Sequence, residues 1–95
     1  MILSFRSRET ARIFAGETCR AIPVHIQQAA RRKLRMLAAA VDLGDLRQPP
    51  GNRLEKLAGD REGQHSIRVN AQWRICFEWP SGSRGPANVE IVDYH

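Results

Sequence analysis

The stretch SIRVNAQWRICFEW, residues 66–79, decides the fold. Its apolar residues occupy every second position on both sides of residues 70–72, and they are Ile67, Val69, Trp73, Ile75, Phe77 and Trp79. This period is typical of strands that bury one face. We therefore expect a hairpin that turns at residues 70–72, with Arg68 and Arg74 side by side on the face opposite the core.

The residues before Gly44 have the period of helices instead. After Pro23, which a first helical turn accepts, apolar residues recur at spacings of 4, 4, 3 and 4, and they are Ile26, Ala30, Leu34, Leu37 and Val41. These spacings place them on one helical face. A shorter helix is expected between Ser7, a suitable N-cap, and Gly16, after a strand at residues 1–5.

The period changes from helical to strand-like at Gly44 and Pro49-Pro50-Gly51. A short strand is expected around Leu54 and Leu57, a loop at residues 80–86 and a last strand at residues 89–92. Residues 1–95 are too few for two cores, so we expect one domain. Its fold class is α+β, with two N-terminal helices packed on one face of a small, mostly antiparallel sheet and a polar face left open.

The charge distribution points to a polyanionic partner. The net charge is +5, and Arg provides 13 of the 15 cations, a residue suited to bidentate phosphate contacts. A coding bias toward Arg is the alternative. Residues 1–36 hold eight cations against two carboxylates, and three of them lie on the polar side of the longer helix: Arg31, Arg32 and Arg35. That side is either simply solvated or binds RNA or a protein partner.

Other functional classes find no support in the sequence. Cys19 and Cys76 are far apart and match no metal-ligand spacing, so we expect reduced thiols, no disulfide and no metal. Gly59 and Gly63 lack the ending of a phosphate-binding loop, and no cofactor is expected. The first residues, MILSFRSRET, lack the apolar core of a signal peptide, and no apolar run is long enough to span a membrane. We expect a cytoplasmic protein with no membrane partner.

The last three residues, Asp93, Tyr94 and His95, follow the final apolar strand directly. Cleavage of RNA by its own ribose 2′-hydroxyl needs a base, a positive charge for the transition state and an acid for the leaving oxygen. His95 suits the acid, Arg74 the positive charge, and Tyr94 or Glu55 the remaining proton transfer. The alternative is that a terminal His is exposed and that an Arg in a strand is solvated.

Two segments together resemble a known family: PPGNRLEKLAGDREGQHSIRVNAQWRICFEW, residues 49–79, and VEIVDYH, residues 89–95. GDREG, WRI and DYH occur in the order found in the HigB branch of the RelE/ParE toxin superfamily, and the likeness covers essentially the whole chain. The resemblance implies a RelE/ParE-like fold and the toxin of a type II toxin–antitoxin module. Such a toxin cuts mRNA in the ribosomal A site, is inhibited by a helix-turn-helix antitoxin and meets operator DNA only through that antitoxin.

The resemblance also assigns roles to single positions. Arg74 matches the transition-state arginine, and the C-terminal catalytic or RNA-contacting residues are matched by Asp93, Tyr94 and His95. Arg53 and Arg61 match basic positions of the same motif. The residues expected to bind RNA are Arg53, Lys56, Arg61 and Arg68.

Two positions depart from the pattern. Glu55 replaces a family His, and Ala58 replaces a basic residue. Glu55 is expected to accept the proton in place of the His. The alternative function is a weakly active or nuclease-dead inhibitor that binds ribosomal components and acts as co-repressor with its antitoxin. A gyrase inhibitor fits less well, because that branch needs no DYH ending. A basic RNA-binding domain without a partner is a further alternative.

Overall fold

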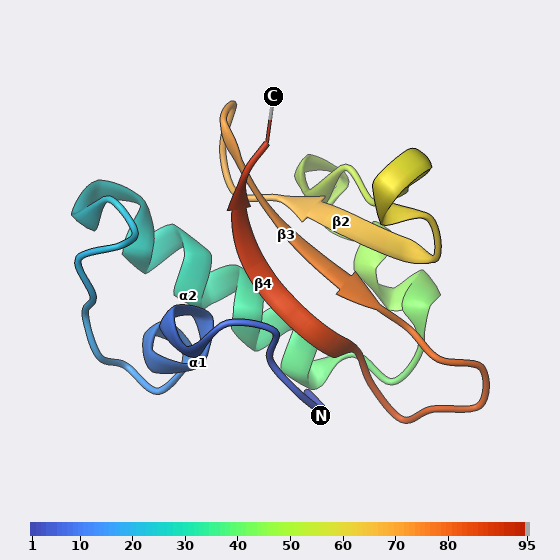
Figure 1. Ribbon diagram of the computed structural model, residues 1–95. Coiled ribbons are helices and arrows are strands. Elements are labelled where there is room, and N and C mark those ends of the chain that lie inside the picture. Colours follow the sequence, from blue (N-terminus) through green and yellow to red (C-terminus); the bar gives the residue numbers. More distant parts are fainter. Residues whose placement is uncertain (95) are drawn as a thin grey trace.

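The computed structural model describes residues 1–94 and consists of a twisted sheet with helices packed on one side (Figure 1). The helices are α1 (Arg8–Phe14) and α2 (Val24–Ala39). The sheet contains β1 (Glu55–Lys56), β2 (Gln64–Arg68), β3 (Trp73–Glu78) and β4 (Ala87–Asp93), in that order and antiparallel throughout. Short 3₁₀ helices occupy the connections: η1 (Leu43–Arg47), η2 (Pro50–Asn52) and η3 (Gly59–Arg61). The predicted α+β class is confirmed.

The hairpin of β2 and β3 has the predicted register. Ile67 lies opposite Ile75, and Arg68 lies opposite Arg74. The apolar side of this hairpin packs on the helices in a core that also includes Ile13, Ile26, Leu34, Leu37, Phe77 and Val89. Each of these side chains is almost completely buried, which stabilises the fold by about 1.5–3 kcal/mol per large apolar side chain.

Helix α2 ends two residues before Val41, which the helical period had placed on the buried face. Ala40 adopts an extended backbone, ψ 137°, and the Val41 side chain is 75% exposed. The cause is a new cap: the carboxylate of Asp45 accepts hydrogen bonds from the N–H groups of Val41 and Asp42, which starts η1. The prediction for Val41 is therefore wrong, while the rest of the predicted apolar face is buried.

The N-terminal segment runs beside β4, but the strand predicted at residues 1–5 is wrong. Only Phe5 forms a ladder bridge, a parallel one with Val89. The pairing is irregular at Asn88, whose φ is 52° and whose N–H donates to the side chain of Ser4 at 2.9 Å. Ser7 then begins α1 as predicted, because its Oγ accepts a hydrogen bond from Thr10 N at 3.2 Å. Among residues 1–94 there is no helix with the length and apolarity needed to cross a bilayer.

Candidate active site

Arg74 is the most strongly held cation of the sheet. It projects from β3 on the side away from the helices and is 8% exposed. Its Nε donates to Ser66 Oγ at 2.7 Å, and its Nη2 donates to the carbonyl oxygens of Arg53 at 2.7 Å and Ser66 at 3.4 Å. Among residues 1–94, no hydrogen bond of this guanidinium uses Nη1. The group is therefore fixed in orientation by its Nε and Nη2 atoms.

The polar face of the sheet is not open, contrary to the prediction. Ser66 and Cys76 are fully buried on it. Arg61, at the end of η3, reaches over this face and donates from Nη1 to Gln64 Oε1 at 3.1 Å and to Glu90 Oε1 at 3.0 Å. The prediction failed because strand periodicity places a side chain on a face but does not show which connecting segments fold over that face.

The covering of this face changes the chemistry of the groups beneath it. Burial raises the pKa of the Cys76 thiol, with a further small contribution from Glu90, against the lowering effect of Arg61. The hydrogen bond from Arg61 to Glu90 raises the pKa of the Arg61 guanidinium, which is charged at any physiological pH in either case. Cys76 is therefore a protonated, packed thiol, and Arg61 joins the η3 turn to β4.

Two predicted catalytic residues lie beside Arg74. Glu55 shares its register position with Ser66, and its Oε1 lies 3.9 Å from Arg74 Nη2. The Arg74 Cζ atom lies 6.0 Å from the centre of the Tyr94 ring, at the outer limit of a cation–π contact. The Glu55 side chain is 53% exposed and Tyr94 is 37% exposed, so both are accessible to a ligand that reaches Arg74.

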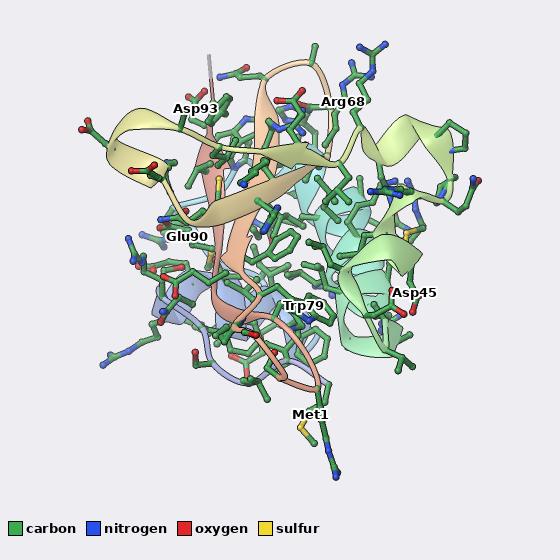
Figure 2. All side chains as sticks on the ribbon, turned by 90° about the vertical axis from the view of Figure 1, so that its right-hand side faces the viewer. Met1, Asp45, Arg68, Trp79, Glu90 and Asp93 are labelled. Atoms are coloured by element: carbon green, nitrogen blue, oxygen red, sulfur yellow. The ribbon has the colours of Figure 1, made fainter. Side chains whose placement is uncertain are left out.

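Asp93 has a different orientation along β4. It lies opposite Trp73, whereas Val92 lies opposite Arg74. Because successive side chains of a strand point to opposite faces, Asp93 is on the face of the sheet opposite to Arg74. Its Oδ2 accepts a hydrogen bond from Gln72 Nε2 at 3.0 Å. In Figure 2, Asp93 and Arg68 lie toward the same end of the sheet, and Met1 and Trp79 lie at the other end. The predicted catalytic residue His95 is outside the described residues.

The four basic residues predicted to bind RNA are held in different ways. Arg53 is exposed, has a left-handed φ of 46° and presents its carbonyl to Arg74. Arg68 donates from Nε to the carbonyl of Asn70 at 3.1 Å. Lys56 is exposed and lies opposite His65 in the ladder, on the other face of β1 from Glu55. The guanidinium of Arg61 is paired with the carboxylate of Glu90.

The basic side of α2 is less uniform than its sequence. Arg32 and Arg35 are exposed. Arg31, in contrast, donates to the carbonyl oxygens of Ile13 at 2.8 Å and Glu17 at 3.2 Å, which ties α2 to the end of α1. A hollow of about 280 Å³ is lined by these three arginines and Gln28. The predicted partner surface therefore has two outward cations and one structural cation.

Sequence reasoning missed two buried residues behind the segment whose carbonyl binds Arg74. Ser66 has the strand period of the polar face, so its position opposite the core could be read from the sequence. Asn52 and Lys33 gave no such signal: both are buried, and they are hydrogen-bonded to each other. Among residues 1–94 there is no group of three or more His, Cys, Asp or Glu side chains placed to hold a metal ion.

Comparison with known proteins gives one consistent assignment. Residues 3–95 match the family described as RelE-like toxin of type II toxin-antitoxin system HigB. Toxin HigB-1 of Vibrio cholerae serotype O1 is 43% identical over 83 residues, which cover 86% of this chain and 87% of that protein. Endoribonuclease HigB of Proteus vulgaris is 33% identical over 95 residues, the full length of both chains. The chain therefore belongs to the HigB family of RelE-like toxins, whose members act in type II toxin–antitoxin systems and so have an antitoxin as partner.

Proposed function

We propose that this toxin is an endoribonuclease that cuts mRNA on the ribosome in the cytoplasm. The observation that carries the proposal is the arrangement at Arg74: a buried guanidinium fixed by Ser66 and the Arg53 carbonyl, next to one carboxylate and one phenol. The name of the Proteus vulgaris relative, Endoribonuclease HigB, supports the same reaction class.

The proposed reaction is an internal transesterification of RNA. The ribose 2′-oxygen attacks the adjacent phosphorus, the bond from phosphorus to the 5′-oxygen breaks, and a 2′,3′-cyclic phosphate is left. One group removes the proton of the 2′-hydroxyl, and a second protonates the 5′-oxygen as it leaves. Negative charge accumulates on the non-bridging oxygens, where a preorganised guanidinium stabilises the transition state most effectively.

We assign these roles to named side chains. Arg74 binds a non-bridging oxygen through Nη1. Glu55 accepts the proton of the 2′-hydroxyl, since its exposed carboxylate is 3.9 Å from Arg74 Nη2. His95 donates the proton to the 5′-oxygen, with Asp93 orienting its ring. The Tyr94 ring stacks on a base beside the scissile bond.

Neighbouring cations hold the RNA backbone on both sides of this phosphate. The residues proposed for this are Arg53, Lys56, Arg61 and Arg68. Arg61 takes part as a fixed charge, because it already holds Glu90.

The antitoxin is proposed to be a helix-turn-helix protein that places an acidic segment on the basic side of α2. The exposed Arg32 and Arg35 supply the attraction, and Arg31 forms the wall of the same hollow. Association between opposite electrostatic fields is fast and sensitive to salt. Operator DNA is reached only through this antitoxin, and the complex represses its own operon.

Expression of the chain alone in cells, with growth and mRNA 5′ ends recorded, tests the proposal. The parent should arrest growth and produce new mRNA ends, and co-expression of the antitoxin should restore growth. Arg74→Ala and deletion of His95 should abolish both effects, whereas Arg84→Ala, an exposed arginine in the loop before β4, should not. Growth arrest without new mRNA ends would instead support the alternative, an inhibitor that binds ribosomal components without cutting.

A further inference from the structure

A second hollow lies on the other side of the edge strand from Arg74. Its volume is about 280 Å³, and it is lined by Leu43, Gly44, Arg47, Leu54, Lys56 and His65. It is bordered by η1, β1 and β2. Since β1 is the outermost strand and has only two residues, the side chains of Glu55 and Lys56 project to its opposite faces. A bound polymer that crosses the β1 edge from the Arg74 side would therefore contact the Arg74 site first and the hollow next.

One wall of the hollow is a flat, uncharged ring. His65 stacks on Phe77, with ring centres 6.0 Å apart and an interplanar angle of 30°. Burial, and then the charge of Lys56, lowers the pKa of this imidazole below its usual 6.5, so it is neutral at pH 7. Leu43 and Leu54 add apolar surface beside it. A flat ring next to apolar side chains is the surface on which a nucleobase stacks.

The rim of the hollow is positively charged. Arg47 and Lys56 are both exposed, and no carboxylate is among the described side chains that line the hollow. Arg47 comes from a rigid turn, because η1 begins with a reciprocal capping box between Asp42 and Asp45 and is anchored by the buried Leu46. Two cations over an apolar, aromatic wall are the combination that single-stranded nucleic-acid sites use.

We propose that this hollow binds one nucleotide of the RNA strand that continues from the phosphate held at Arg74. Arg47 and Lys56 contact its phosphate, and its base stacks on His65 between Leu43 and Leu54. The proposal rests on the function proposed above and extends it: RNA crosses the β1 edge and is held on both faces of the sheet.

Binding of an RNA that cannot be cleaved tests the site separately from catalysis. A short single-stranded RNA with 2′-O-methyl groups throughout has no free 2′-hydroxyl to attack, so fluorescence anisotropy with the full chain measures binding alone. The test variants are the pair Arg47→Ser with Lys56→Ser, and His65→Ala. The matched control is the pair Arg20→Ser with Arg84→Ser, which removes the same charge from exposed positions outside both sites.

The double variant at Arg47 and Lys56 should bind more weakly than the charge-matched control. The slope of its log affinity against log salt should be smaller by about 0.7 for each phosphate that the variant no longer neutralises. His65→Ala should bind about fivefold to a hundredfold more weakly through loss of one stacked base, and His65→Phe should restore the affinity because it keeps a flat ring.

The proposal is overturned if both pocket variants bind as the control does, or if the parent does not bind the methylated RNA. It is also overturned if these variants lose affinity only for the antitoxin. If the pocket variants bind RNA more weakly but the parent cuts no mRNA in cells, the result supports this nucleotide site and rejects the proposed nuclease activity. If the pocket variants bind RNA as the control does but cleavage depends on Arg74, the result supports the nuclease activity and rejects this nucleotide site.

Discussion

Lys33 of α2 donates a hydrogen bond to the side-chain oxygen of Asn52, and both residues are buried, with 7% and 0% of their surface exposed. Asn52 in turn donates to the carbonyl oxygens of Leu46 and Gln48 at 3.1 and 3.2 Å. The next residue, Arg53, gives its carbonyl to Arg74. A buried lysine beneath the sheet therefore fixes the segment that orients the arginine above it.

Lys33→Met should lower the free energy of unfolding by about 1–3 kcal/mol, because it leaves the buried oxygen of Asn52 without a donor. The neighbouring Arg32 is exposed, and Arg32→Met should change stability by no more than about 0.5 kcal/mol. Urea denaturation of both variants checks the difference. Equal stabilities would mean that the Lys33 hydrogen bond contributes nothing to the fold.

His65 should make the fold less stable in mild acid. Burial lowers the pKa of its folded-state imidazole below 6.5, so the unfolded chain takes up the proton first as the pH falls. The free energy of unfolding should therefore decrease as the pH falls from about 6.5 to the folded-state pKa of His65. Below that pH, His65 is protonated in both states and causes no further change. Denaturation measured across this range should show a shallower decrease for His65→Gln, and identical slopes would contradict the assignment.

Gly85→Ala should disturb the N-terminal segment. A Cβ atom at this position would lie 1.6 Å from the carbonyl oxygen of Met1, which is backbone and not a flexible side chain. The substitution should cost about 1–3 kcal/mol and speed amide exchange at Leu3, whose N–H donates to Pro86 at 2.8 Å. At Gly51 no atom lies within 4 Å of such a Cβ, so Gly51→Ala is the matched control. If both variants are equally stable, the contact with Met1 does not matter.

The sequence was sufficient for features that depend on local periodicity. Alternation predicted the β2–β3 hairpin and the pairing of Arg68 with Arg74, and helical spacing predicted the buried side of α2 up to Leu37. Helix termination before Val41 required the Asp42–Asp45 cap to be recognised, which was possible in principle from the two carboxylates at that spacing.

The burial of the site was not predictable in the same way. The carbonyl of Arg53 binds Arg74, and Arg61 binds Glu90 on the same face of the sheet. Both arginines come from connecting segments that no periodic pattern describes. Lys33 was counted only among the eight cations of residues 1–36, because its tertiary contact with Asn52 leaves no signal in the sequence. The grouping of Glu55 and Tyr94 beside Arg74 came from the family resemblance more than from any spacing.

The central claim is that Arg74 stabilises the transition state, and single-turnover cleavage of mRNA on programmed ribosomes by Arg74→Lys tests it most directly. Lysine keeps the charge but cannot bind Ser66 and the Arg53 carbonyl while also presenting a second nitrogen to the phosphate. The cleavage rate at saturating toxin should fall about a hundredfold to a thousandfold, with little change in ribosome affinity. The variant should stay folded, although the loss of a buried hydrogen bond should lower its melting temperature. A folded Arg74→Lys variant that cuts at the parent's rate would contradict the account.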